Sequence, residues 1–470
     1  MRQLFRVFIP ASIVALTLSE IALIFLCYLT GSWLLSVLPF MNPYMMFGSY
    51  LTDEGGLIQI SIVTVCLFLG LYFQSLYSNV RVKSIGLLVQ QVCLVIGVAF
   101  LIQALIAYAR KPEWSLPRYA MIFGSLMALI LVPAWRVFFT RVILKFMNPQ
   151  RLIFLGTSSI SKEIAAHLVA RPEVGMSVLG YIDDSDSGAD LPGGRVIGRV
   201  EDLSTIAKTL NPDIIVVGMA ERRRELPMSE MLHLRFSGVH FEEAAVTFEA
   251  AFGRVSTREM RPSRLVFSAD LGPRKGSLFW HSLYSIPIAV LLVIVFLPFM
   301  LITAILVRLT SRGPVFHRQK RVGLNGDVFT LYKFRSMYMD AEARTGPVWA
   351  KKDDPRITPI GKWIRRFRLD ELPQLLNVLR NEMALVGPRP ERPEFVESLN
   401  EQIPYYNYRH CVKPGITGWA QINYKYGDTL DDAIMKLEYD LYYIKNLAVS
   451  LDLFIVAHTL KTMLFSETAQ

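Results

Sequence analysis

Four long apolar stretches at the start of the chain constrain its fold more than any other feature. Each has about the 20 residues that an α-helix needs to cross the hydrocarbon core of a bilayer. They cover residues 7–29, 57–77, 85–109 and 119–135. The first is too long for a simple signal peptide and lacks a cleavage site of small residues. We therefore expect residues 1–148 to form a bundle of four membrane-spanning helices.

Composition and charge distribution support a membrane protein with soluble parts. Hydrophobic residues make up 52% of the chain and charged residues 19%, which is too apolar for an ordinary soluble protein. Lys and Arg flank the first stretch, lie between the second and third, and follow the fourth, whereas the loop of residues 30–56 has none. The positive-inside rule then places both ends of the bundle in the cytoplasm, although the basic loop of residues 110–118 runs against it.

One ionisable residue, Glu20, lies inside the first apolar stretch. Such a group usually faces other helices rather than lipid. We expect Glu20 to make a packing contact. The four cysteines and seven histidines of the chain show no metal-ligand spacing.

Residues 149–262 have an alternating strand and helix pattern. Apolar runs at 151–156, 178–184 and 212–219 are typical of buried strands, and a helix-like run lies at 161–170. This alternation predicts a parallel, Rossmann-like sheet.

The first turn of this α/β segment lacks a full dinucleotide fingerprint. Only Gly156 is present, although Asp183 and Asp184 follow at about the distance of a ribose-binding acid. We expect a degenerate nucleotide-binding fold used for assembly or regulation. A membrane-anchored nucleotide-sugar dehydratase or epimerase is the main alternative, but it needs a Tyr-x-x-x-Lys pair, and no lysine here has a tyrosine four positions before it.

A fifth apolar run and a basic block follow the α/β segment. Residues 284–307 carry no charge and contain Pro298, and residues 308–368 carry 15 Lys or Arg against 5 Asp or Glu. Directly after an apolar run, such a block indicates a membrane surface and phosphate ligands rather than nucleic acid. A positive-inside anchor alone would also account for it.

The last part of the chain carries several long motifs in a fixed order. They are YKFRSM at 332–337, DPRIT at 354–358, Gly361-Lys362, Arg365-Arg366, LDELPQ at 369–374, LVGPRP at 385–390 and VKPGITGWAQIN at 412–423. Over residues 271–465 they closely resemble the bacterial sugar transferases, the polyprenyl-phosphate hexose-1-phosphate transferases. The preceding bundle and Rossmann-like segment resemble the large multi-domain, monotopic branch of that family.

The adjacent carboxylates Asp370 and Glu371 are the candidate catalytic residues. Asp370 is of the type that caps a helix, and Pro373 is tolerated in a first turn, so we expect a helix to start here and to direct its positive end at a phosphate. The resemblance implies that Asp370 attacks the sugar-linked phosphate of a UDP-sugar and that Glu371 holds Mg²⁺. A phosphosugar-aspartate then passes its phosphosugar to undecaprenyl phosphate, and UMP is released.

Four basic residues are candidates for binding the substrate phosphates. Prolines fix the backbone around Arg389, which suits a preset guanidinium fork. Lys333 and Arg335 alternate with aromatics as on a strand, and they could bind phosphate or anionic headgroups. Arg366 lies close before the acid pair.

The run 284–307 is long enough to span a bilayer, but spanning would put the last part of the chain outside the cell. The resemblance instead implies a re-entrant helix that breaks at Pro298 and leaves on the cytoplasmic face. Relatives usually have serine before that proline, whereas this chain has Leu297. We thus expect residues 271–470 to form a mostly α, monotopic catalytic domain at the bacterial inner membrane.

The resemblance also implies the partners and the pathway. They are a UDP-sugar, undecaprenyl phosphate, membrane lipid and a second copy of the chain in a homodimer, with no nucleic acid. The reaction would be the first membrane step of exopolysaccharide or O-antigen synthesis. A non-catalytic scaffold of a polysaccharide export complex is a third possibility, and the sequence does not reveal the hexose.

Overall fold

In the computed structural model the chain forms two compact units, and the boundary between them along the sequence lies between Glu243 and Ala244. Residues 3–8 group with the second unit. The structure describes residues 2–4, 7–9, 11–37, 46–74, 76–77, 84–109, 112–144, 149–171, 174–184, 191–218, 226–259, 272, 275–339, 356–424, 427 and 429–465.

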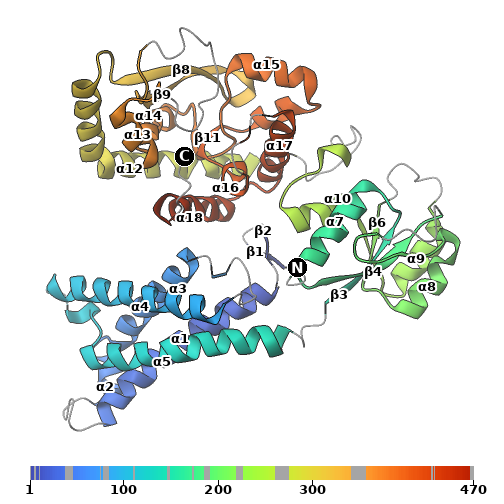
Figure 1. The fold of residues 1–470 in the computed structure, drawn as a ribbon, viewed down its shortest axis with the longest axis horizontal. Helices are drawn as coiled ribbons and strands as arrows, with labels where there is room; N and C mark the ends of the chain where they lie inside the picture. Colours follow the sequence, from blue (N-terminus) through green and yellow to red (C-terminus); the bar gives the residue numbers. More distant parts are fainter. Residues whose placement is uncertain are drawn as a thin grey trace. The chain divides into compact units, whose positions relative to one another are not determined.

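A helical bundle forms the first part of the first unit (Figure 1). Four of its helices are long and apolar enough to cross a membrane, as their composition predicts. The bundle elements are α1 (Ala11–Val37), α2 (Phe47–Thr52), α3 (Gly56–Phe73), α4 (Ile85–Tyr108), η1 (Pro112–Trp114), α5 (Arg118–Phe138) and η2 (Phe139–Ile143), after the short strands β1 (Arg2–Leu4) and β2 (Val7–Ile9).

Helices α1 and α5 approach each other closely through two glycines. A Cβ atom on Gly31 would lie 2.8 Å from the Gly124 backbone nitrogen, and one on Gly124 would lie 2.3 Å from the Tyr28 ring. The Tyr28 hydroxyl is hydrogen-bonded to Ser125 Oγ at 2.8 Å. Small residues and interhelical hydrogen bonds of this kind are how helices associate inside a bilayer.

A buried ion pair also joins these two helices. Arg136 donates from Nε and Nη2 to the two carboxylate oxygens of Glu20 at 2.7 and 2.6 Å. The side chains of Arg136 and Glu20 are 2% and 0% exposed. Arg136 also donates to the Leu76 carbonyl and lies over the Tyr77 ring. The expected packing role of Glu20 is confirmed.

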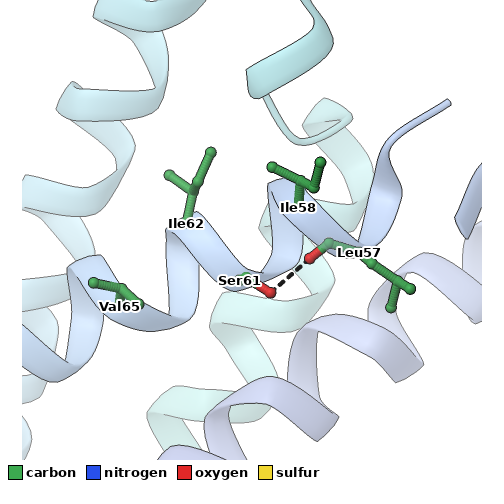
Figure 2. Close-up of a pocket in the computed structure, with 5 residues that line it drawn as sticks. All are labelled: Leu57, Ile58, Ser61, Ile62 and Val65. Atoms are coloured by element: carbon green, nitrogen blue, oxygen red, sulfur yellow. Dashed lines mark hydrogen bonds between the residues drawn. The ribbon is translucent and has the colours of Figure 1, made fainter.

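A shallow hollow lies along one side of α3 (Figure 2). Its lining is apolar except for Ser61, whose hydroxyl donates to the Leu57 carbonyl one turn earlier at 2.7 Å. The remaining lining residues are Ile58, Ile62 and Val65. Surfaces of this composition suit lipid chains and offer no group for acid–base or phosphoryl chemistry.

A five-stranded parallel sheet follows the bundle, as the alternating pattern predicts. Its order is β5-β4-β3-β6-β7, and helices are interleaved between the strands. The three strands expected from the apolar runs correspond to β3, β4 and β6, whereas β5 and β7 were not anticipated. The elements are β3 (Gln150–Leu155), α7 (Ser159–Ala170), β4 (Met176–Ile182), β5 (Val196–Gly198), η4 (Val200–Asp202), α8 (Leu203–Leu210), β6 (Ile214–Val217), α9 (Met228–Phe236) and β7 (His240–Glu243).

The second unit is mostly helical, with two small two-stranded sheets. Strands β8 and β9 pair antiparallel, and β10 and β11 pair parallel. Its elements are α10 (Ala244–Phe252), η6 (Thr257–Glu259), α12 (Lys275–Thr310), β8 (Phe316–Val322), η7 (Leu324–Gly326), β9 (Val328–Phe334), α13 (Pro359–Arg366), η8 (Leu369–Glu371), α14 (Gln374–Leu379), β10 (Ala384–Val386), α15 (Pro393–Gln402), η9 (Tyr406–Cys411), β11 (Gly415–Thr417), α16 (Trp419–Asn423), α17 (Leu430–Lys445) and α18 (Val449–Phe465).

Helix α10 starts immediately after β7 but packs within the second unit. Lys445 of α17 donates to Glu249 at 2.6 Å. The Trp419 indole donates to the Gly253 carbonyl at 2.7 Å. Arg254 is paired with Glu438 at 2.5 Å. The second unit therefore starts inside the range 149–262 predicted for the α/β domain, and the predicted domain limits stay predictions.

Helix α12 is longer than the apolar run that predicts it. It has 36 residues and contains Pro287 and Pro298 without ending at either. Figure 1 shows it bent into two arms. It is long and apolar enough to cross a membrane. The re-entrant path and a break at Pro298 stay predictions.

Candidate functional site

The acid pair lies in a 3₁₀ turn between α13 and α14. Arg368 takes the left-handed conformation (φ 52°) and turns the chain into η8, which contains Asp370 and Glu371. Helix α14 begins only at Gln374, after Pro373. The expected role of Asp370 as a helix cap is therefore wrong, because Asp370 lies inside the 3₁₀ turn and α14 begins four residues later.

Leucines on both sides anchor this turn to α12. Leu369 and Leu372 pack in a cluster with Met300 and Val307 of that helix. The carboxylates are thus held beside the last third of the most apolar helix of the second unit.

Three cations converge on Glu371. Lys333 Nζ lies 3.3 Å from Oε1, Arg389 Nη2 lies 3.5 Å from the same oxygen, and Arg368 Nη1 lies 3.6 Å from Oε2. Burial would raise the pKa of this carboxyl, but the charges of the three cations outweigh it and lower the pKa to about 2. Glu371 is therefore ionised at neutral pH.

Asp370 has the opposite shift. Burial, and next the negative charge of Glu371, raise its pKa to about 6, and the charges of Lys333 and Arg365 oppose this rise. The two neighbouring acids thus differ in proton affinity, as in sites where two carboxylates have different roles. At pH 8 both are ionised, and the Asp370 carboxylate is the more basic of the two.

The strand that carries Lys333 is fixed to the helix after the acid pair by one buried amide. Asn377 of α14 is fully buried. Its Oδ1 accepts from Tyr332 N at 3.2 Å, and its Nδ2 donates to the Thr330 carbonyl at 2.7 Å. Sequence reasoning missed Asn377, because the residue lies inside an ordinary apolar helix pattern.

Of the four predicted phosphate-binding residues, Lys333 and Arg389 contact Glu371. Arg335 is 4% exposed and donates to Ser311 O and Oγ, both at 2.7 Å, at the end of α12. Arg366 lies at the exposed C-terminal end of α13. Arg365 and Arg368 also act electrostatically on the acids, in addition to Arg389. Asp354 and Pro355 lie outside the described residues.

The acids of the Rossmann-like segment are engaged within their own domain. Asp183 Oδ2 accepts from Thr157 N at 2.7 Å and from its hydroxyl at 2.6 Å. Asp184 Oδ1 accepts from Val200 N at 3.0 Å. Both candidate ribose ligands thus hold the turn after β3 and the segment after β5.

The acid pair could hold a magnesium ion only together with oxygen ligands from a substrate. Across the described residues, no three side chains of His, Cys, Asp or Glu gather into a ready-made site. Mg²⁺ is commonly held by one or two carboxylates together with substrate phosphates. Glu371, fully ionised and next to Asp370, satisfies that pattern once a diphosphate substrate is present.

Comparison with known protein families gives two matches. The model described as bacterial sugar transferase matches residues 277–466, which contain the acid pair and its cations. The model described as CoA-binding domain matches residues 73–224, from the end of α3 through most of the parallel sheet.

Curated relatives match over different shares of the chain. A UDP-glucose:undecaprenyl-phosphate glucose-1-phosphate transferase of Klebsiella pneumoniae is 34% identical over 344 residues, 72% of each chain. The enzyme of the same name from Xanthomonas campestris pv. campestris is 31% identical over 330 residues, 69% of this chain and 68% of the relative. A UDP-N-acetylgalactosamine-undecaprenyl-phosphate N-acetylgalactosaminephosphotransferase of Aeromonas hydrophila is 44% identical over 216 residues, and the chain spans only 50% of it.

Proposed function

The chain belongs to the bacterial sugar transferase family, and from this premise we propose that it transfers a hexose-1-phosphate from a UDP-sugar to undecaprenyl phosphate. The products are an undecaprenyl-diphosphate sugar and UMP. Relatives named for this reaction with glucose, galactose or N-acetylgalactosamine support the donor class and the acceptor.

In the proposed reaction Asp370 is the nucleophile. Its carboxylate oxygen bonds to the sugar-linked phosphorus, and the bond from that phosphorus to the bridging oxygen breaks, so that UMP leaves with the bridging oxygen. A phosphate oxygen of the lipid then bonds to the same phosphorus, and the bond to Asp370 breaks, which restores the carboxylate. A carboxylate with a pKa raised to about 6 is ionised at pH 8 yet more basic than an ordinary aspartate.

The surrounding cations would bind and orient the phosphates. Lys333, Arg368 and Arg389 outnumber the two carboxylates, so the cluster attracts a diphosphate. We propose that Glu371 holds Mg²⁺, which when bound neutralises charge on the transferring phosphates. The same three cations keep Glu371 ionised and oriented, and charged acids of this kind are the ligands that Mg²⁺ prefers.

We further propose that the reaction takes place on the cytoplasmic face of the bacterial inner membrane. Contact of the acid-bearing turn with apolar α12 supports a site at the lipid boundary. A re-entrant path of α12 would keep the site on the side where UDP-sugars are made. A homodimer and a role at the first membrane step of exopolysaccharide or O-antigen synthesis remain part of this proposal.

The observation that carries the proposal is the pairing of a basic carboxylate with a cation-bound, fully ionised neighbour. The test is UMP release by the purified chain in detergent, with undecaprenyl phosphate, Mg²⁺ and a panel of UDP-sugars. We expect one sugar to be turned over and Asp370→Asn to abolish turnover. Brief incubation with radiolabelled donor alone should leave label on the wild-type protein but not on Asp370→Asn.

A matched control comes from a second acidic pair, which lies at the start of α17. Asp431 lies exposed in the first turn of α17 beside Asp432, and Asp431→Asn should retain full turnover. Full turnover by Asp370→Asn, or UMP release with none of the UDP-sugars, would refute the proposal.

A further inference from the structure

The backbone that carries Arg389 is fixed by hydrogen bonds along its length. The loop of residues 386–391 runs from β10 toward α15 and contains two prolines, which restrict φ. Five of its carbonyls accept hydrogen bonds from four different segments, namely α12, β8, η9 and β11. The donors to residues 386, 388, 389, 390 and 391 are, in that order, His281 Nε2, Gly415 N, Arg409 Nη2, Arg321 Nη1 and Val322 N, at 2.8–3.0 Å.

Arg409 binds the backbone of Arg389, the residue of this loop whose side chain contacts Glu371. Its Nη2 donates to the Arg389 carbonyl at 3.0 Å. The guanidinium is 5% exposed and forms a fork on Asp440 Oδ2, from Nε at 3.0 Å and from Nη2 at 2.7 Å. Its Nη1 donates to the Tyr406 hydroxyl at 2.8 Å, and the group lies over the Tyr406 ring.

The buried Arg409 guanidinium is oriented by Asp440 and Tyr406, so its bond to the Arg389 carbonyl is fixed in direction. Asp440 is 2% exposed and lies on α17, in the packed core of the unit. Through Arg409 this core reaches the backbone of Arg389, whose side chain lies 3.5 Å from Glu371. A displacement of about 1 Å in such a chain can cost a hundredfold in rate.

We propose that Arg409, oriented by Asp440 and Tyr406, is a positioning residue that sets Arg389 for the phosphoryl transfer proposed above. It acts through the backbone and touches no substrate. The inference rests on the proposed function. It assigns Arg409 a role in turnover that is exerted only through Arg389.

A double-mutant cycle tests this role. Arg409→Lys keeps the charge but cannot form the fork and the carbonyl bond together. UMP release is measured in single turnovers with enzyme in excess, so that slow variants remain measurable. We expect Arg409→Lys to lower the rate at least tenfold in the wild-type background but less than twofold in the Arg389→Ala background.

The matched control is a second buried ion pair, whose acid lies on the same helix α17 as Asp440. Arg254 and Glu438 are 9% and 5% exposed, and Glu438 lies two residues before Asp440. Arg254→Lys should lower the unfolding temperature as Arg409→Lys does. Any loss of rate that Arg254→Lys causes should be the same in the wild-type and the Arg389→Ala backgrounds.

Asp440→Asn keeps the shape of the side chain and gives a second variant should Arg409→Lys fold poorly. Its rate loss should likewise shrink in the Arg389→Ala background. Equal losses in both backgrounds for the variant that folds would overturn the inference while wild-type turnover still upholds the proposed function. No UMP release by the wild type would instead refute the proposed function itself.

Discussion

The ion pair between Glu20 and Arg136 provides a sharp test of the membrane bundle. The perturbation is Glu20→Met, which leaves Arg136 buried without its carboxylate. The comparison variants are Arg136→Met and the double substitution. Breaking a buried pair by removing one partner is costly, because an uncompensated charge remains in a low-dielectric site.

The expected loss follows from the contacts. Glu20→Met removes two charge-assisted bonds of 2.7 and 2.6 Å, each worth about 1.5–3 kcal/mol. The bond to Leu76 O at 3.0 Å and the Tyr77 ring 5.0 Å away are present in both proteins and cancel in the difference. The two lost bonds sum to about 3–6 kcal/mol, and we expect a loss of about 3–5 kcal/mol, the range known for buried pairs.

Thermal unfolding of the purified chain in detergent, followed by tryptophan fluorescence, measures this loss. Trp135 lies next to Arg136 and donates to Ser19 at 2.9 Å, so its share of the emission of the seven tryptophans reports on the α1–α5 contact. Each single substitution should lower the unfolding temperature on the order of 10 °C.

The double substitution should recover most of the loss, since apolar side chains replace both charges. It should lie within about 1 kcal/mol of wild type, apart from the donor that Leu76 O loses. Single substitutions that leave the unfolding temperature unchanged, or a double variant less stable than both, would refute the reasoning.

Three further predictions concern other sites. Burial raises the pKa of Asp452 to about 8, so the folded chain keeps a proton that the unfolded chain releases from about pH 4 upward. The unfolding temperature should thus fall between about pH 4 and 8, and Asp452→Asn should remove that part of the slope. Lys333→Ala should lower UMP release about a hundredfold, whereas Arg335→Ala, which loses the bonds to the end of α12, should chiefly lower the unfolding temperature. Gly124→Ala should cost about 1–3 kcal/mol in a denaturant titration, because its methyl would lie 2.3 Å from Tyr28, and an unchanged midpoint would contradict the close approach of α1 and α5.

Sequence patterns predicted the elements whose apolar residues form continuous runs. The long helices of the bundle and the strands β3, β4 and β6 are of this kind. Strand β5 has three residues and β7 has the sequence HFEE, which is too short or too polar for such a pattern. Their pairing depends on the neighbouring strands of the sheet rather than on their own composition.

Side-chain direction was the weakest part of the site prediction. Lys333 lies on β9 and Arg335 directly follows that strand, and the sequence pattern treats them alike, yet Lys333 contacts Glu371 and Arg335 donates to Ser311 at the end of α12. Sequence spacing places both on one face of a strand. Their targets depend on what lies at each end of that face, which only tertiary packing decides. The sequence pattern showed no sign of Asn377 either, because the residue lies in an ordinary apolar helix pattern and its contacts with β9 arise only from tertiary packing.

The absence of a spacer between β7 and α10 affects how this protein can be shortened. The family match begins at residue 277, but a chain cut there would leave Glu438 without Arg254 and the Trp419 indole without the Gly253 carbonyl. A fragment intended to fold as the transferase should start at Ala244, well ahead of its recognisable motifs.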